Sequence, residues 1–449
     1  MVQLSHPTRP PASGRPPRLA ALDGLRLLAA LMVVLYHYVG LGHGWSTSSR
    51  TLFPEVFPFA AYGWLGVQLF FLISGFVICM SCWGRSLGDF FTSRVVRLYP
   101  AYWFCVLATT AVLVLVPGGY VRLAWPDVLT NLTMVQAFLG VKPVDPVYWT
   151  LFAELRFYLL FAFVAWRGLT YRRVLLFCCL WGTAALTFDR FGFGAFGQFL
   201  MPEHCWFFIA GMAFYLMYRF RPTVVLWGVV LVSFAAAVPT ARATWRVSVK
   251  NMDQWVPFWP VMAVLTVSFL AMALVATGRT NRITWRWLPV AGALTYPLYL
   301  LHQYIGWELV TYAEKHLLLH PWALLGGVLG LMLTAAYLVH RIIEEPAARW
   351  LKPRIQAGIE DAAGRAERAR TAGPKATRHV PQAALSPSVS SAPAPETVTP
   401  DSRGELLTAG AWSSPARGSD APSPHSRTGP DRCARPHHHG GPSNGVTGR

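Results

Sequence analysis

The chain has 449 residues, of which 54% are hydrophobic and only 13% are charged, and its formal net charge is +18. Soluble domains carry about 25% charged residues, so this composition excludes an ordinary soluble protein and favours a membrane protein with many spans. The positive charge does not indicate nucleic-acid binding, because most Lys and Arg lie between apolar runs or near the C-terminus.

Apolar runs of the length that crosses a bilayer, about 20 residues, recur along the chain. We therefore predict an all-α polytopic membrane helix bundle over residues 21–353, with about ten transmembrane helices. The basic segment 1–20 lacks the apolar core of a cleaved signal peptide, and the first span would act as a signal anchor. The predicted spans are 22–40, 60–80, 99–116, 148–166, 173–188, 200–218, 223–239, 256–276, 288–312 and 321–343.

The placement of Lys and Arg predicts the orientation in the plasma membrane. With the N-terminus in the cytoplasm, the inner segments hold fourteen of these residues and the outer loops hold eight. Because positive residues accumulate on the cytoplasmic side, both termini are predicted to be cytoplasmic. The loop 240–255, with Arg242, Arg246 and Lys250, runs against this bias.

The C-terminal segment 354–449 has a different composition, rich in Pro, Ser, Ala, Gly and Arg. It cannot bury enough apolar surface to offset its ordering entropy, so we predict a disordered cytoplasmic tail. The run 437–439 is three histidines, and Cys79 and Cys82 form a C-x-x-C pair. Neither has the partners of a metal site, and no metal is expected.

The first predicted span, LDGLRLLAALMVVLYHY at 22–38, carries three ionisable residues. Helical geometry places Asp23, Arg26 and His37 on one face, with Arg26 and His37 separated by roughly 16 Å along the axis. Ionisable side chains are costly in lipid, so they mark a site facing the bundle interior by default.

Two further stretches carry ionisable groups suited to chemistry. In YWTLFAELRFYLL, 148–160, Glu154 is predicted to lie at a depth similar to His37, where a carboxylate would orient a histidine base. The alternative is a structural hydrogen bond between two helices. In FFTSRVVRLYP, 90–100, Arg94 and Arg97 lie one turn apart and are suited to phosphate, or to a lipid headgroup.

The remaining polar residues within spans admit structural interpretations as well. Ser74 lies among small residues that permit close helix packing. Tyr299 and His302 share a face, and Pro297 is predicted to kink their helix. Glu344 and Glu345 are interpreted as structural, paired with arginines of the inner loops.

Together these motifs resemble the acyltransferase-3 family of integral-membrane O-acyltransferases. The matching stretches occur in the family's order and cover about residues 20–352. They are LDGLRLLAALMVVLYH, GVQLFFLISGFVI, SRVVRLYPAY, YWTLFAELRFYLL, TYPLYLLH and IIEEPAARW.

The resemblance implies transfer of an acyl group, often acetyl, from acyl-CoA to a hydroxyl. It implies that His37 and Glu154 are catalytic and that Arg26, Arg94 and Arg97 bind acyl-CoA. Many relatives carry an acidic residue where this chain has Gln68, which places any charged role there in doubt. We take the candidate substrate pocket to include Asp23, Gln68, Ser74, Tyr158, Tyr299 and His302.

The expected acceptor is a hydroxyl of a cell-envelope glycan or glycolipid, or of a secondary metabolite such as a macrolide. An alternative is a proton-coupled transporter in which His37, Glu154 and His302 relay protons. A second alternative is an assembly factor that binds lipid without chemistry. The arginine pair and the lack of repeat halves favour the acyltransferase over the transporter.

Overall fold

The computed structural model describes residues 19–116, 124–191, 197 and 199–371, and these residues form helices and loops without β-strands. The polar N–H and C=O groups of a backbone in a bilayer must find hydrogen-bond partners within the protein. A helix provides these partners within one segment. The structure has α1 Ala20–Leu35, the π-helix η1 Tyr36–Gly40, α2 Ser49–Leu52, α3 Phe57–Ala60, the 3-10 turn η2 Gly63–Leu65, α4 Gly66–Cys82, α5 Leu87–Leu115, α6 Trp125–Asn131, the 3-10 turn η3 Pro146–Tyr148, α7 Trp149–Trp166, α8 Tyr171–Phe191, α10 Cys205–Arg219, α11 Val224–Met252, α12 Trp259–Ala276, α13 Leu288–Leu301, α14 Tyr304–His316, α15 Pro321–Val339, the π-helix η4 His340–Glu344 and α16 Glu345–Thr371.

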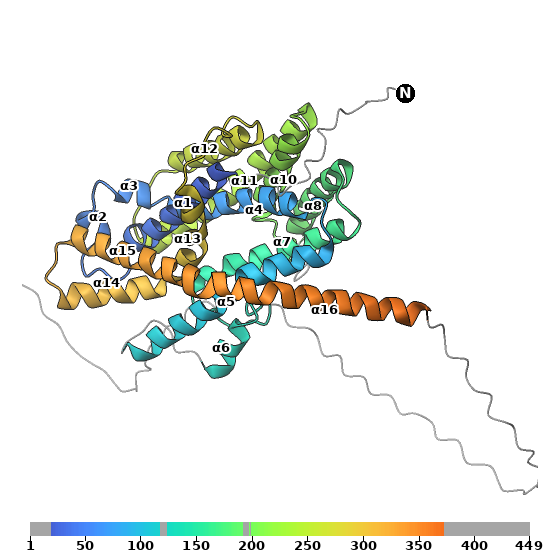
Figure 1. Ribbon diagram of the computed structural model, residues 1–449. Coiled ribbons are helices and arrows are strands. Elements are labelled where there is room, and N and C mark those ends of the chain that lie inside the picture. Colours follow the sequence, from blue (N-terminus) through green and yellow to red (C-terminus); the bar gives the residue numbers. More distant parts are fainter. Residues whose placement is uncertain (1–18, 117–123, 192–196, 198, 372–449) are drawn as a thin grey trace, which may run out of the picture. The chain divides into compact units, whose positions relative to one another are not determined.

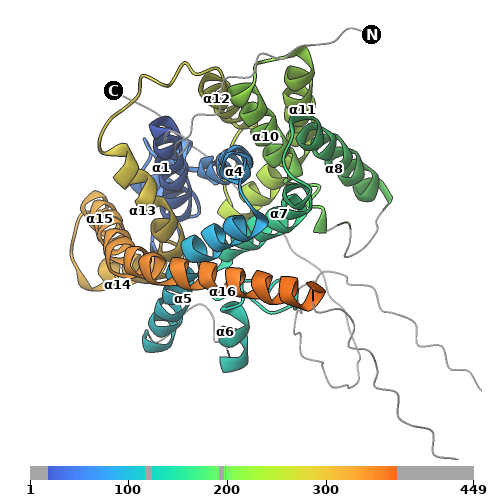
Figure 2. The same ribbon diagram turned by 45° about the vertical axis from the view of Figure 1, so that its right-hand side comes forward.

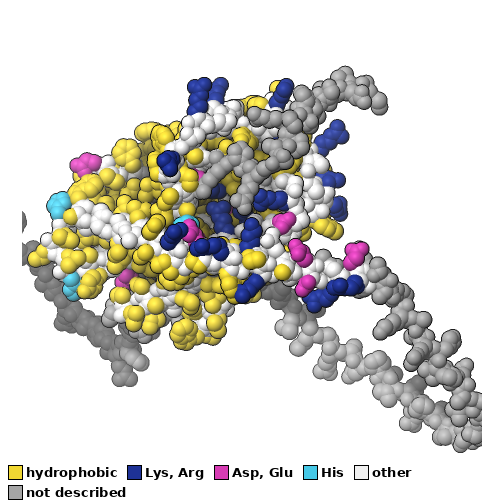
Figure 3. All heavy atoms as spheres, in the orientation of Figure 1, with side chains coloured by type: hydrophobic (Ala, Val, Ile, Leu, Met, Phe, Trp, Pro, Cys, Tyr) yellow, Lys and Arg dark blue, Asp and Glu magenta, His cyan; other side chains and the backbone are white. Residues whose placement is uncertain are grey.

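The helices confirm a multi-pass membrane protein, but the predicted number of spans is not confirmed. Among the described residues, seven helical segments are long and apolar enough to span a membrane, and α10 and α13 are shorter apolar helices. The segment 173–188, predicted as a span, lies in α8, which is not one of the seven. Large apolar side chains cover much of the outer surface, as expected where lipid is the solvent (Figure 3).

Three predicted boundaries are wrong. The span 99–116 belongs to α5, which already begins at Leu87, so Arg94 and Arg97 lie on a helix and not in the loop before it. The span 223–239 is part of α11, which continues to Met252. The basic residues of the predicted loop 240–255 lie on the last turns of that helix. The tail was predicted to be disordered from residue 354, yet α16 extends to Thr371 and packs along α5 (Figures 1 and 2). Ile359 of α16 lies close to Gly88, and the Gln356 amide donates to the Asp89 carboxylate. Residues 372–449, with the histidine run, lie outside the described residues.

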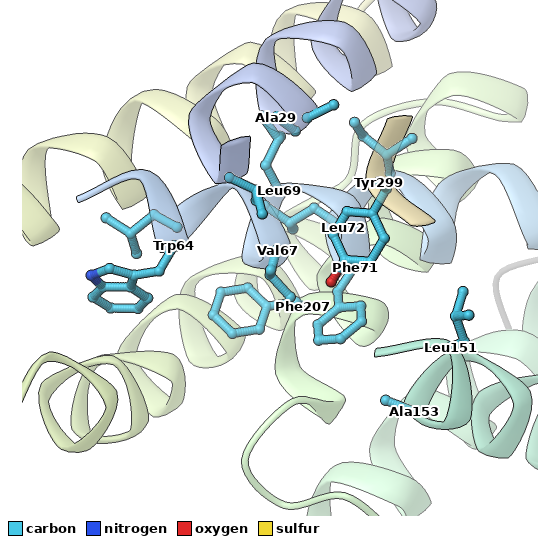
Figure 4. Close-up of a cluster of buried hydrophobic side chains, with 14 of the residues drawn as sticks. Ala29, Trp64, Val67, Leu69, Phe71, Leu72, Leu151, Ala153, Phe207 and Tyr299 are labelled. Carbon is cyan, nitrogen blue, oxygen red and sulfur yellow. The ribbon is translucent and has the colours of Figure 1, made fainter. Parts of the chain in front are cut away.

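Helix α4 lies in the middle of the bundle and packs against α1, α7, α10 and α12 (Figure 2). Glycines allow the closest approach: a Cβ on Gly75 would lie 2.2 Å from the Phe208 carbonyl oxygen, and one on Gly211 would lie 2.2 Å from that of Leu72. Figure 4 shows Leu72 of α4 between Ala29 of α1 and Phe207 of α10. The buried side chains around α4 therefore form the core that holds the surrounding helices in place.

The predicted span 288–312 is broken after Leu301, between α13 and α14, and Pro297 lies inside α13. A broken helix in a membrane protein needs partners for the backbone groups that it frees. Here the Tyr38 hydroxyl donates to the His302 carbonyl at 2.8 Å, and the Tyr304 N–H donates to Asp145 Oδ2 at 3.1 Å. The break is therefore built by side chains from distant parts of the chain, and it places the His302 ring at the end of α13.

Asp145 is fully buried and supports two backbone N–H groups, those of Val147 and Tyr304. We expect Asp145→Ala to destabilise the protein by about 2–6 kcal/mol, because each of the two buried N–H groups that loses its acceptor costs about 1–3 kcal/mol. Thermal unfolding of the purified protein in detergent measures the effect, with Asp361→Ala on the exposed face of α16 as the control. An Asp145→Ala protein that unfolds at the wild-type temperature would contradict this role.

Candidate active site

A cavity of about 100 Å³ lies among α1, α4, α5, α7 and α13. Seven of the predicted site residues line it, so the structure brings together groups that are far apart in the sequence. Val67, Phe70, Phe71 and Leu151 form part of its apolar wall, and Figure 4 shows Phe71 beside Tyr299. The seven predicted residues are Arg26, Ser74, Arg94, Arg97, Glu154, Tyr158 and Tyr299.

Three arginines give this cavity an excess of positive charge. Arg94 and Arg97 lie one turn apart on α5, and Arg26 reaches the cavity from α1. Asp23 lies behind Arg26, with Oδ1 3.5 Å from Nη1, and does not itself line the cavity. With Glu154 as the one carboxylate in the described lining, the arrangement favours an anionic ligand.

Glu154 holds a different partner from the one predicted. Its Oε1 accepts a hydrogen bond from the Ser74 hydroxyl at 2.7 Å, which joins α7 to α4 beside the cavity. The prediction that Glu154 orients the ring of His37 is not what the structure shows, because the His37 ring contacts another histidine. Similar depth in two helices does not determine which of their faces meet. The side chain that contacts His37 is His302, at the end of α13.

His37 lies in the π-helix that continues α1, a local widening of the helix that is often found at functional sites. Its Nδ1 is 2.8 Å from the Val33 carbonyl oxygen. A carbonyl oxygen only accepts, so Nδ1 carries the proton and Nε2 has a free lone pair. The Trp307 indole N–H also donates to the His37 carbonyl oxygen at 3.1 Å, which fixes the backbone there. His37 is therefore held in the form that a general base requires.

His302 is fully buried beside His37, and neither histidine lines the cavity. Its Nε2 lies 3.2 Å from His37 Nδ1, and its own Nδ1 lies 2.8 Å from the Tyr299 carbonyl oxygen. The Tyr299 side chain faces the cavity, where its hydroxyl lies 2.9 Å from Thr150 Oγ1. Tyr299 therefore connects the arginine-lined cavity to the histidine pair through its own backbone.

Gln68, predicted as a pocket residue, does not line the cavity. It is buried, and its Oε1 has no hydrogen-bond partner among the described residues. On α4 the residues that line the cavity are Val67, Phe70, Phe71, Ser74, Val77 and Ile78, and Gln68 is not among them. The structure gives no account of why an amide stands at this position.

Glu344 and Glu345 were predicted to pair with arginines of the inner loops, and this is wrong. Glu344 accepts from the His340 ring at 2.7 Å, and Glu345 pairs with Arg341 one turn earlier. These pairs lie at spacing i and i+4 on one helix, which brings side chains together without any tertiary contact. The structural interpretation of both carboxylates remains, with different partners.

Sequence reasoning missed Tyr38, Asp145 and Trp307, which position the histidine pair. Each acts on a backbone group rather than on another side chain, so no spacing of chemically matched residues indicates it. The one local signal was Asp145 directly before Pro146, which is a capping position for the turn that follows.

The fold and the site together define a multi-pass membrane protein with a charged cavity inside its helix bundle. Residues 19–341 match the family described as "Acyltransferase domain". The chain therefore belongs to the acyltransferase-3 family, as its motifs predicted.

Two curated proteins are similar to this chain. "Acyltransferase MdmB" of Streptomyces mycarofaciens is 27% identical over 374 residues, which cover 74% of this chain and 92% of that protein. "Putative peptidoglycan O-acetyltransferase YrhL" of Bacillus subtilis (strain 168) is 25% identical over 162 residues, which cover 32% of this chain and 23% of the longer relative. No solved structure matches the chain.

Proposed function

We propose that the protein transfers an acyl group, with acetyl as first choice, from acyl-CoA to a hydroxyl of a cell-envelope glycan, glycolipid or secondary metabolite. The observation that carries the proposal is the cavity in which Arg26, Arg94 and Arg97 face one space in a member of an acyltransferase family. Guanidinium groups bind phosphate oxygens in a bidentate way, and coenzyme A carries several phosphates.

The proposed reaction uses the lone pair on Nε2 of His37. The acceptor hydroxyl attacks the thioester carbonyl, its proton passes to Nε2, and a new C–O ester bond forms as the C–S bond breaks. The proton then passes from Nε2 to the departing thiolate, which leaves as free coenzyme A and returns the histidine to its neutral form. No metal is required by this sequence of steps.

In this scheme Glu154 is a binding residue rather than the partner of His37. Its carboxylate balances part of the arginine charge and holds the Ser74 hydroxyl at the cavity wall. With both termini in the cytoplasm, acyl-CoA reaches the cavity from the cytoplasmic side. The N-terminal ends of α1 and α5 lie on that side, close to Arg26 and Arg94.

Peptidoglycan is a natural first acceptor to test, because one similar protein is named for its O-acetylation. Mass spectrometry of envelope glycans and secreted metabolites from a deletion strain should show an acyl mass missing from one of them. Unchanged glycans and metabolites in the deletion strain would count against the proposed acceptors.

Removing a cavity arginine should weaken binding of the donor. We expect Arg94→Ala and Arg97→Ala each to raise KM for acetyl-CoA by about 10- to 100-fold, because a hydrogen bond to a charged group contributes about 1.5–3 kcal/mol. Initial rates of coenzyme A release by the purified protein measure the effect. Arg85→Ala, an exposed arginine before α5, serves as the matched control and should keep the wild-type KM. Equal KM values in all four proteins would show that the cavity does not bind the donor phosphates.

A further inference from the structure

His302 is a fully buried ionisable residue to which the reaction above assigns no step. Its Nε2 lies 3.2 Å from Nδ1 of His37, and the centroids of the two rings are 4.8 Å apart with their planes at 73°. Neither histidine lines the arginine-lined cavity, but His302 contacts the proposed base directly, so an effect of His302 on the reaction would act through His37.

Two backbone carbonyls determine where the protons of this pair lie. The Val33 carbonyl oxygen is 2.8 Å from Nδ1 of His37, and the Tyr299 carbonyl oxygen is 2.8 Å from Nδ1 of His302. Each carbonyl can only accept, so both rings carry their proton on Nδ1. Nε2 of His302 is then an acceptor. The Nδ1–H of His37 is shared between this nitrogen and the Val33 carbonyl oxygen.

This arrangement gives His302 an effect that grows during the reaction. When Nε2 of His37 takes the acceptor's proton, the ring becomes positively charged and its Nδ1–H becomes a stronger donor. Hydrogen bonds from a charged donor are roughly twice as strong as neutral ones. The lone pair on Nε2 of His302 therefore stabilises the charged form of His37 more than the neutral form, which lowers the barrier.

We propose that His302 is a positioning residue that fixes the ring of His37 and supports its protonated form. The inference rests on the proposed function. The backbone around His302 does not depend on its ring, because the Tyr38 hydroxyl donates to the His302 carbonyl and the His302 N–H donates to the Leu298 carbonyl. Substitutions of the side chain should therefore leave the break between α13 and α14 in place.

Three variants of His302 separate this role from simple anchoring of the ring. His302→Leu removes both ring hydrogen bonds. The amide of His302→Asn reaches the position of Nδ1 and can still donate to the Tyr299 carbonyl, but it leaves His37 without an acceptor. The amide of His302→Gln reaches the position of Nε2 and can accept from His37, but it loses Tyr299.

The test compares acetyl transfer from acetyl-CoA by the full-length purified variants, with binding of coenzyme A followed by thermal shift. We expect His302→Leu to lower kcat by about 10- to 100-fold, the loss of one charge-assisted hydrogen bond, with little change in KM. His302→Gln should recover most of the lost kcat, and His302→Asn should not. All three should keep the thermal shift with coenzyme A.

The inference is overturned if His302→Leu keeps the wild-type kcat, or if His302→Asn is as active as His302→Gln or more active. It is also overturned if all three variants lose coenzyme A binding, since His302 would then serve only the fold. A wild-type protein that transfers no acetyl group would overturn the proposed function itself. An inactive His37→Ala beside a fully active His302→Leu would overturn the His302 inference alone.

Discussion

His37→Ala should abolish acyl transfer, with a fall in kcat of at least about 10²- to 10⁴-fold, the usual contribution of a general acid–base residue. The variant lacks the Nε2 lone pair that takes the proton of the acceptor. The backbone carbonyl oxygen of residue 37 accepts a hydrogen bond from the Trp307 indole, and an alanine there keeps this acceptor. The protein should therefore remain folded, and its KM for acetyl-CoA should change little.

The measurement is the rate of ester formation from acetyl-CoA, made on protein that shows the wild-type thermal shift with coenzyme A. His316→Ala is the matched control, because His316 is an exposed histidine at the far end of α14 and should be silent. Near-normal transfer by His37→Ala would exclude His37 as the base.

Gly75→Val should prevent the bundle from assembling. A Cβ at this position would lie 2.2 Å from the carbonyl oxygen of Phe208, where neither helix backbone can move without opening the core around α4. Overpacking of a core by added methyl groups costs about 1–3 kcal/mol, and occasionally more. A backbone contact this short belongs at the upper end, so we expect little folded protein after extraction.

Gly326→Val provides the comparison, because a Cβ at Gly326 of α15 meets no atom within 4 Å. The yield of monodisperse protein and its unfolding temperature in detergent measure both variants. If Gly75→Val and Gly326→Val behave alike, the close contact between α4 and α10 does not hold the bundle together.

The helix class and the charged residues of the cavity lining could be predicted from the sequence. Arg26 and Glu154 are ionisable residues in predicted spans, and the high cost of exposing such groups to lipid indicates that they face an interior space. Arg94 and Arg97 were predicted in the loop before a span, and they lie on a helix because α5 already begins at Leu87. Spacing along one helix is also readable, which is why the Arg94 and Arg97 pair was predicted to act together.

The partner of His37 could not be predicted in the same way. Depth along each helix follows from residue number, but the neighbour that a helix face meets depends on how the helices pack. The break after Leu301 is set by contacts with distant residues such as Tyr38 and Asp145. These contacts involve backbone groups, whose partners leave no periodic pattern in the sequence.

The most direct test of the account follows an isotopically labelled acetyl group from acetyl-CoA with the purified wild-type protein. Peptidoglycan fragments, a glycolipid and a macrolide serve as acceptors, and released thiol is measured beside labelled ester. If the protein transfers acetyl from acetyl-CoA to a hydroxyl, one acceptor gains the label, with one coenzyme A released for each ester formed. Failure of every acceptor to gain label, with no release of thiol above the protein-free rate, would contradict it.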